Sequence, residues 1–365
     1  MNHQIFKPCF QKKNSIRNIL IIKPSSLGDI VHSLPVAKAV RQIFPDASIV
    51  WLVKDEWSEI LKGNPYIDEI ISFPFSFKKI ARLIGILRKK RFDLVVDIQC
   101  LFRSGLIGYL AGVPIRIGFE NGRELSHIFY NIKVKVPDMD IHAVDRYMLV
   151  PAELEKVIGK SSGYNTDSKD FTMITSIEDE EYIEKFFNDN NIGNNSIIAA
   201  ISPSARWHTK MWLTERFAEV ADILNKKGVI TILVGSRSDR PLIDKITSLM
   251  STNPVIAAGK TNLKQLISLL KRTDIMITND SGPMHIAAAI GTPIVAIFGP
   301  TDPVRTGPYG NSHVVIRRND IDCLPCLKRK CYNNILCMNL ITVDEVTEEA
   351  IKMLKHSKPN LKGGL

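Results

Sequence analysis

The first half of the chain repeats one pattern: a short apolar run, a polar or glycine-containing turn, and then an amphipathic segment. Apolar runs without strict alternation are typical of parallel strands that helices cover on both faces. The pattern predicts strands over residues 19–24, 48–53, 69–74 and 93–99, and helices over 36–44, 57–63 and 103–112. These elements indicate a doubly wound α/β domain.

The same pattern restarts after a polar stretch at residues 160–171, which we interpret as a linker. It predicts strands over 196–204, 229–236, 254–260, 274–280 and 293–300, and helices over 213–228, 239–250, 262–273, 284–291 and 343–357. A chain of 365 residues is also long for a single core, which favours two domains. Ligands of such folds bind at the carboxyl ends of the strands, so two facing sheets would share one cleft.

Composition is that of a globular protein, with 45% hydrophobic and 24% charged residues and no apolar run near the roughly 18 residues that span a bilayer. The basic N-terminus lacks the apolar segment of a signal peptide, which favours the cytoplasm. A net charge of +10 suits nucleic acid, an anionic membrane or phosphorylated substrates. Scattered cations and the lack of a nucleic-acid-binding signature in the sequence argue against nucleic acid.

The most basic segment is "SFKKIARLIGILRKKRFD", residues 76–93. We interpret it as an amphipathic helix with a solvated charged face, and contact with a membrane surface is the alternative.

Four of the six cysteines crowd into residues 323–337: Cys323, Cys326, Cys331 and Cys337. Disulfides are uncommon in the cytoplasm, which leaves metal ligation or reduced thiols. The first pair has the spacing of half a zinc site, but the second pair is more widely spaced than in a standard zinc knuckle. Reduced thiols are therefore the favoured interpretation, and a structural metal is the alternative.

Polar loops follow the predicted strands of the second half. Residues 279–282, Asn-Asp-Ser-Gly, precede a helix that opens near Pro283, and the free N–H groups of such a turn suit a diphosphate. Ser204, Arg206 and Lys210 follow an earlier strand, and the two cations suit phosphate oxygens.

Asp239 follows the next strand, where a carboxylate can accept hydrogen bonds from ribose hydroxyls. Each loop alone is more simply a polar connection, and Asp280 alone is as well explained as a helix cap. Their coincidence at one sheet edge favours a ligand site.

In the first half, Asp29 follows the apolar run at residues 19–22. Small residues and Gly28 would let a sugar hydroxyl approach this carboxylate. From the residues alone, the plainer interpretation is that Asp29 or Ser33 caps a helix whose first turn contains Pro35.

Several motifs together resemble glycosyltransferase family 9, the bacterial lipopolysaccharide heptosyltransferases. They cover the chain from Asn18 to Met338 and are "KPSSLGDIVHSLP", "DIQCLFRSGLIGYLAG", "NGRELSHIFYN", "HAVDRY", "SPSARWHTKMW", "NDSGPMHIAAAIGTPIVAIFGPTDP" and the cysteine cluster. The first motif and "RELSHIFYN" are most similar to heptosyltransferase I, whereas "NDSGPMH" and the cysteines are more similar to the second enzyme or to undifferentiated members of the family. The resemblance implies the GT-B architecture, two Rossmann-like domains facing a cleft. It gives an acceptor-binding domain at 1–175, a donor-binding domain at 176–345, and the end of a helix with a tail at 346–365.

The resemblance implies an inverting transfer of heptose from ADP-L-glycero-D-manno-heptose to the Kdo/heptose inner core of lipopolysaccharide, without cofactor or catalytic metal. It makes Asp29 the base. It gives donor binding to Ser204, Arg206, Lys210, Asp239, Asp280, Ser281, Gly282 and His285, and acceptor binding to Ser26, Arg123, His142 and Arg146. Cations at the acceptor positions suit Kdo carboxylates and lipid A phosphates. The lipid acceptor also implies contact with the anionic inner face of the inner membrane.

Two alternatives stay open: a sugar-nucleotide epimerase on the same architecture, and a non-catalytic protein that binds nucleotide-sugars or lipid. The triplet at residues 138–140, Asp-Met-Asp, mimics the metal-binding motif of other glycosyltransferases. It lies in a proline-containing loop of the acceptor half, so we interpret it as coincidence.

Overall fold

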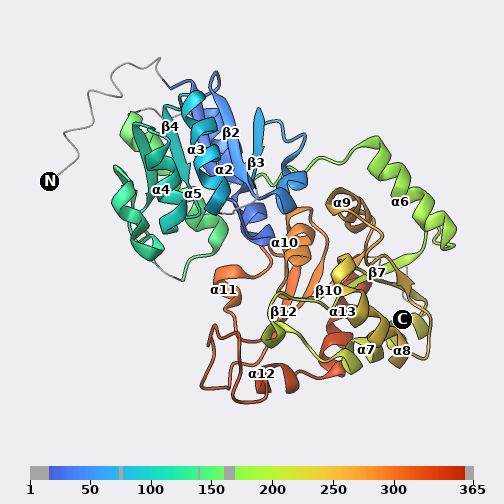
Figure 1. Cartoon of the computed structure of the whole chain (residues 1–365). Coiled ribbons are helices and arrows are strands. Elements are labelled where there is room, and N and C mark those ends of the chain that lie inside the picture. Colours follow the sequence, from blue (N-terminus) through green and yellow to red (C-terminus); the bar gives the residue numbers. More distant parts are fainter. Residues whose placement is uncertain (1–15, 74–76, 139, 160–168, 358–365) are drawn as a thin grey trace. The chain divides into compact units, whose positions relative to one another are not determined.

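The structure, a computed structural model, describes residues 16–73, 77–138, 140–159 and 169–357. The chain separates into two compact units, Met1–Ile174 and Thr175–Leu365 (Figure 1). The predicted linker at residues 160–171 lies mostly outside the described residues. Its last part is bound to unit 1, because the Asp170 carboxylate accepts hydrogen bonds from Lys38 Nζ at 3.0 Å and from the Tyr66 hydroxyl at 2.8 Å.

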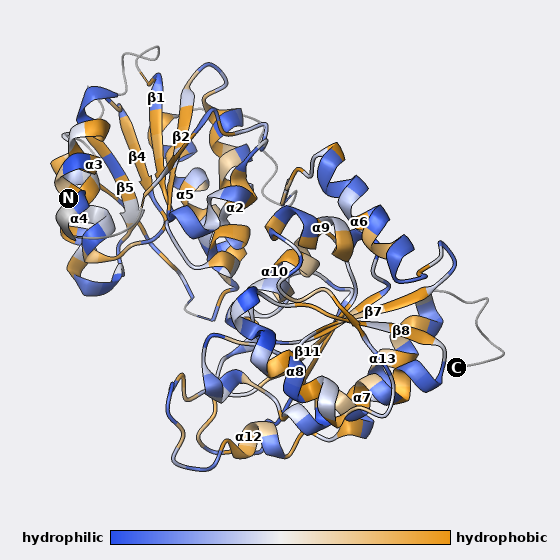
Figure 2. Ribbon diagram, turned by 45° about the vertical axis from the view of Figure 1, so that its right-hand side comes forward, coloured by the Kyte–Doolittle hydropathy of each residue, from blue (hydrophilic) through white to orange (hydrophobic). Residues whose placement is uncertain are grey.

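Unit 1 is built on a parallel sheet in the order β3-β2-β1-β4-β5-β6. Its strands are β1 (Asn18–Ile22), β2 (Ser48–Val53), β3 (Glu69–Ser72), β4 (Leu94–Asp97), β5 (Ile115–Phe119) and β6 (Ile132–Val134). Its helices are α2 (Leu27–Ile43), α3 (Phe77–Lys89), α4 (Phe102–Leu110) and α5 (Ala143–Ile158), with 3-10 turns η1 (Asp55–Leu61) and η2 (Arg123–Phe129). Helices α3 and α4 cover one face of the sheet, and α2 and α5 cover the other (Figure 2).

Unit 2 repeats the topology with the order β12-β11-β10-β7-β8-β9, again parallel. Its strands are β7 (Ile197–Ser202), β8 (Val229–Leu233), β9 (Val255–Ile256), β10 (Ile275–Asn279), β11 (Ile294–Phe298) and β12 (His313–Arg317). Its helices are α6 (Ile177–Asp189), α7 (Thr214–Lys226), α8 (Arg240–Leu249), α9 (Leu263–Lys271), α10 (Gly282–Ala289), α11 (Pro303–Thr306), α12 (Leu336–Asn339) and α13 (Val343–Ser357), with 3-10 turns η3 (His208–Lys210) and η4 (Arg237–Asp239).

The predicted α/β fold class is confirmed, and the central strands show why the apolar pattern does not alternate. The side chains of residues 19–22 in β1 and 275–277 in β10 are fully buried, because helices cover both faces of each sheet. The sequence pattern missed β5, β6, β12, α5 and α6. It also gave a helix over residues 57–63 where the chain forms the 3-10 turn η1. In the part of the chain that the structure describes, no helix is long and apolar enough to cross a bilayer.

A glycine in β5 lets an aromatic ring lie directly against the strand. A Cβ atom at Gly118 would fall 2.5 Å from the ring of Tyr130. The Tyr130 hydroxyl donates a hydrogen bond of 2.7 Å to Asp97, which is fully buried at the end of β4. The Asp97 carboxylate also accepts the backbone N–H groups of Gln99 and Cys100, each at 3.0 Å. Burial raises the pKa of Asp97 although these bonds oppose the shift, and together they fix the turn that leaves β4.

Candidate active site

Asp29 lies in the first turn of α2, just beyond the carboxyl end of β1. Its Oδ2 atom accepts hydrogen bonds from Ser26 N at 3.1 Å and from Ser26 Oγ at 2.7 Å, and Ser26 is the N-cap of the helix. The predicted cap was therefore misplaced: Ser26 is the cap, Asp29 supports it from the third helical position, and Pro35 lies well inside α2. This arrangement occupies one oxygen of Asp29 and leaves the other to face the rest of the unit.

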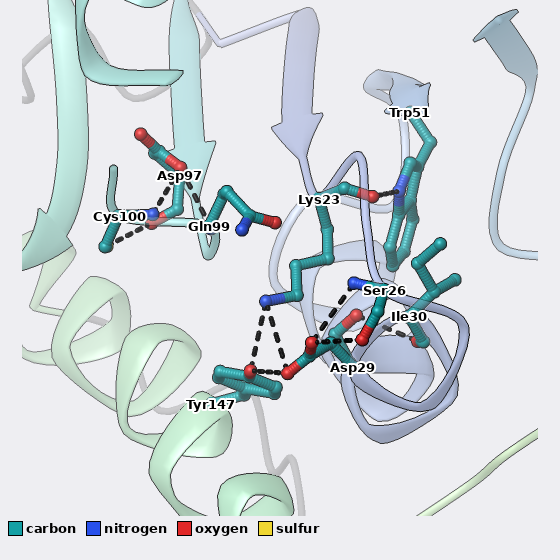
Figure 3. A network of polar contacts seen from close by, with 10 residues as sticks. Lys23, Ser26, Asp29, Ile30, Trp51, Asp97, Gln99, Cys100 and Tyr147 are labelled. Atoms are coloured by element: carbon teal, nitrogen blue, oxygen red, sulfur yellow. Dashed lines mark hydrogen bonds and ion pairs between the residues drawn. The ribbon is translucent and has the colours of Figure 1, made fainter. Parts of the chain in front are cut away.

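The second oxygen of Asp29 faces a buried lysine and a tyrosine (Figure 3). The Tyr147 hydroxyl donates to Asp29 Oδ1 at 3.0 Å, and Lys23 Nζ donates to the Tyr147 hydroxyl at 3.0 Å. Lys23 Nζ also lies 3.8 Å from Asp29 Oδ1. Because an ammonium group can only donate, Tyr147 uses its single proton on Asp29. The contacts therefore have one direction, from Lys23 through Tyr147 to Asp29.

The protonation states of this cluster follow from its burial and its charges. Burial acts to raise the pKa of Asp29, but the Lys23 charge and the Ser26 hydrogen bonds outweigh it and hold this pKa well below its usual value. Burial and the Asp29 charge raise the pKa of Tyr147 to about 12. Burial acts to lower the pKa of Lys23, yet Asp29 and Tyr147 leave it above its usual value. Asp29 is thus ionised at neutral pH, and its side chain, 38% exposed, is within reach of a ligand.

The residues predicted to bind an acceptor take different positions in unit 1. His142 is the N-cap of α5, and its ring lies 5.1 Å from that of His32 in an edge-on contact. The Arg146 guanidinium, one turn further along α5, lies 4.8 Å from the centre of the Phe119 ring. Arg123 is exposed at the start of η2. Ser26, His142 and Arg146 thus belong to the two helices that carry Asp29 and Tyr147, whereas Arg123 lies on a separate turn.

In unit 2, Lys210 and Asp280 meet beyond the carboxyl ends of β7 and β10. Lys210 Nζ lies 2.5 Å from Asp280 Oδ2, and Thr301 Oγ1 donates to the same oxygen at 2.7 Å. His285 Nε2 lies 3.9 Å from Asp280 Oδ1. Asp280 is not the cap of α10, because Ser281 holds that position and Asp280 pairs with Lys210. The cap interpretation is therefore wrong, and the predicted meeting of polar side chains at one sheet edge holds for Lys210, Asp280 and His285.

The remaining donor candidates surround this pair or lie apart from it. Ser281 caps α10 and Gly282 is its first residue, and free N–H groups at a helix start are the kind of group that binds anions. Ser204 is half-buried and Arg206 exposed in the loop that leads to Lys210. The Asp239 carboxylate accepts hydrogen bonds from Ser236 N at 2.7 Å and Ser236 Oγ at 2.6 Å, which reproduces the Ser26–Asp29 arrangement at the end of β8.

The cysteine segment, residues 323–337, packs against the loop that carries Lys210. Thr209 Oγ1 donates to the Lys328 carbonyl at 2.9 Å. The Arg329 guanidinium and Lys210 Nζ lie 5.1 and 4.9 Å from the centre of the Trp207 ring. The segment therefore supports the loop in which the donor candidates lie.

The four cysteines of this segment line one pocket together with Thr209 and Pro300. Cys331 Sγ accepts the backbone N–H groups of Asn333 and Ile335 at 3.4 and 3.3 Å. Burial raises the pKa of Cys337. Within the described ranges, however, no group of three or more His, Cys, Asp or Glu side chains is placed to hold a metal ion. The thiols share a pocket without forming a ligand set.

Sequence reasoning missed Lys23, Tyr147 and Thr301. A lysine directly after a buried strand was the available signal for Lys23, because lysine is almost never buried unless its charge is paired. Tyr147 lies 118 residues from Asp29 along the chain, and nothing in its local sequence links the two. Thr301 follows β11, and its hydroxyl donates to Asp280. Its neighbour Asp302 caps α11.

Comparison with known proteins identifies the family to which the chain belongs. The family described as "Glycosyltransferase family 9 (heptosyltransferase)" matches residues 80–336. The lipopolysaccharide core heptosyltransferase OpsX of Haemophilus influenzae is 29% identical, over 82% of this chain and 84% of that protein. The structure of ADP-heptose LPS heptosyltransferase II of E. coli is 25% identical with a TM-score of 0.74, covering 93% of this chain and 99% of that one. A family 9 glycosyl transferase of Veillonella parvula shares the fold, with a TM-score of 0.80, 24% identity, and coverage of 93% and 97%. The chain therefore belongs to glycosyltransferase family 9, as its motifs predicted.

Proposed function

We propose that this protein transfers heptose from ADP-heptose to the Kdo/heptose inner core of lipopolysaccharide, with inversion at the anomeric carbon. The observation that carries the proposal is the family match over residues 80–336, which extends through both units. The acceptor is a lipid-linked sugar, so we place the enzyme at the cytoplasmic face of the membrane that holds it.

We assign binding of the ADP-heptose donor to residues of unit 2. The Lys210 ammonium and the first N–H groups of α10 would meet the diphosphate and stabilise the charge that develops on ADP as it leaves. Asp280 holds Lys210 at the carboxyl edge of the sheet before the donor arrives, and the Thr301 hydroxyl fixes the Asp280 carboxylate in turn. Ser204, Arg206 and His285 would add polar contacts to the phosphates and the sugar. The Asp239 Oδ1 atom would accept hydrogen bonds from the ribose hydroxyls, since Ser236 donates to Oδ2.

We assign binding of the acceptor, and the base that deprotonates its hydroxyl, to residues of unit 1. The acceptor hydroxyl loses its proton to Asp29 Oδ1, its oxygen forms the new bond to the anomeric carbon, and the bond to the diphosphate breaks with its electron pair leaving on ADP. A carboxylate with a depressed pKa is a weak base, so proton transfer occurs late, when bond formation has already acidified the hydroxyl. Ser26, Arg123, His142 and Arg146 would orient the anionic acceptor.

The direct test is incubation of the purified chain with ADP-heptose and a set of Kdo- and heptose-containing acceptors, with the products identified by mass. Heptosyltransfer gives an acceptor heavier by one heptose residue together with free ADP. An isomerised donor without a new glycosidic bond would identify the epimerase alternative instead. Binding without any chemical change would identify a non-catalytic carrier.

Asp29→Asn should lower turnover by a factor on the order of a hundred or more and leave donor affinity nearly unchanged, because only the proton-accepting oxygen is lost. Asn still accepts from Ser26, so the helix cap is kept, but thermal stability should fall because buried Lys23 loses the charge with which it pairs. The matched control is Asp179→Asn in α6, where Ser176 N and Oγ bind Asp179 Oδ2 at 3.0 and 2.9 Å in the same arrangement. The control should keep full turnover.

Normal turnover of Asp29→Asn, with a loss of stability in Asp29→Ala, would show that Asp29 only supports the helix cap. The base would then have to be sought at His32, one helical turn further along α2.

Tyr147→Phe removes the hydrogen bond that favours ionised Asp29, so the pKa of Asp29 should rise. A base with a higher pKa becomes protonated at a higher pH, and the acidic limb of the kcat/KM profile should therefore move upward. Lys23→Met, which removes the nearby positive charge, should move it further. Tyr66→Phe, whose hydroxyl binds Asp170, is the control and should leave the profile in place. An unchanged acidic limb in both Tyr147→Phe and Lys23→Met would remove Asp29 from the proton-transfer step.

Heptosyltransfer should persist in excess chelator, because we propose that Lys210 and the α10 N–H groups, rather than a metal ion, neutralise the charge of the diphosphate.

We also expect purified protein to contain no stoichiometric zinc, since the four thiols form no ligand set among the residues described. Elemental analysis and an assay in EDTA check both statements. About one equivalent of zinc per chain, with loosening of residues 323–337 on its removal, would make the segment a structural metal site.

A further inference from the structure

Large apolar side chains are exposed together on one surface of unit 1. Phe102 and Tyr109 of α4 are 42% and 54% exposed, and Leu125 and Ile128 of η2 are 65% and 60% exposed. We call these four residues the α4–η2 face. Apolar side chains scattered singly over a surface are ordinary, but a group of this size that stays in water requires an explanation.

Phe129 of η2 links this turn to α4. The rings of Phe102 and Tyr109 lie 5.2 and 5.9 Å from the Phe129 ring. Leu125 and Ile128 belong to the same short turn as Phe129. The α4–η2 face is therefore one continuous surface.

The backbone of η2 presents Leu125 to solvent at a conformational cost. Glu124 and Leu125 have φ angles of 55° and 60°, in the left-handed region that residues with a Cβ atom avoid. Glu124 is accounted for, because its carboxylate accepts the N–H of Phe102 at the start of α4. Leu125 gains no burial from this conformation, so its exposure is not explained by the packing of this unit.

The chain around this face is strongly basic. Residues 79–119 contain two acids, Asp93 and Asp97, and the cations Lys79, Arg82, Arg88, Lys89, Lys90, Arg91, Arg103 and Arg116. Asp93 accepts the backbone N–H groups of residues 17 and 18, and Asp97 is fully buried. Lys90 pairs with Glu69 at 2.6 Å, whereas Lys79, Arg82 and Lys89 of α3 are exposed, and this exposed positive charge complements an anionic surface.

Helix α3 supplies much of this charge, and of its large apolar side chains Ile86 is 37% exposed. Leu83 and Leu87 are fully buried against the sheet, while Lys79, Arg82 and Lys89 are exposed. The predicted amphipathic helix is thus confirmed over residues 77–89, and its charged face is open to the membrane contact given above as the alternative. Arg88 Nε donates to the Leu110 carbonyl at 2.8 Å, which ties the end of α3 to the end of α4. The basic helix and the α4–η2 face therefore lie next to each other.

We propose that the α4–η2 face docks the protein on an anionic lipid bilayer. The four apolar side chains enter the interfacial layer, and the exposed cations of α3 pair with lipid phosphates. Arg123, proposed to bind the acceptor, is the first residue of η2, so the docked turn would begin beside the lipid-linked sugar. The docking proposal rests on the proposed function only for its biological purpose, since lipid binding requires neither donor nor acceptor.

The test measures binding of the full chain to vesicles of phosphatidylglycerol and phosphatidylcholine in equal parts, by co-sedimentation at low salt. The variant Leu125→Ser/Ile128→Ser should bind the vesicles at least about tenfold more weakly, because two inserted side chains are lost. The matched control is Ile177→Ser/Leu249→Ser in unit 2, whose side chains are 74% and 47% exposed. The control should bind like the unaltered protein, and binding should weaken as salt rises.

Equal binding by Leu125→Ser/Ile128→Ser, with its circular dichroism unchanged, would overturn the proposal. Equally strong binding of the unaltered protein to pure phosphatidylcholine would overturn the charge argument. A dimer that the variant converts to a monomer, without any change in vesicle binding, would assign the face to a second copy of the chain. Transfer to a soluble, lipid-free acceptor should be the same in variant and unaltered protein, so loss of docking and failure of the proposed chemistry are distinguishable.

Discussion

The parallel pairing of the first and fourth strands of each unit decides where the chemistry can be placed. Ile22 of β1 pairs with Asp97 of β4, and Ser202 of β7 pairs with Thr278 of β10. At such a junction the strand order reverses, and the connections that follow leave toward opposite faces of the sheet. The carboxyl edge stays open there, which is why Asp29 in one unit and the Lys210–Asp280 pair in the other are found beyond these strands.

The sequence predicted this edge well and the contacts across it poorly. Apolar runs located the buried strands, and polar residues after each run located Asp29, Lys210 and Asp280. The sequence placed the loops of Lys210 and Asp280 at one sheet edge, but it did not predict the ion pair between these two residues, which are 70 positions apart. Tyr147 was missed because its place beside Asp29 depends on the packing of α5 against α2. Such packing is a tertiary property that neither helix encodes alone.

Three Ser-x-x-Asp sequences show the limit of local reasoning most clearly. Ser26 with Asp29, Ser176 with Asp179, and Ser236 with Asp239 all form the same pair of hydrogen bonds at a helix start. The residues around a carboxylate in three dimensions, rather than the motif itself, set its chemistry. At Asp29 these neighbours are Lys23 and Tyr147, and their charge and hydrogen bond separate this site from its two local counterparts.

The contact between Gly118 and the Tyr130 ring has a consequence for how sequences of this kind can diverge. A larger side chain at position 118 needs a smaller one at 130, but any residue without the hydroxyl deprives the buried Asp97 of a donor. Loss of that donor in turn favours replacing the acid, which alters the turn after β4. Positions 97, 118 and 130 are therefore physically coupled, so a replacement at one of them destabilises unit 1 unless the other two change with it.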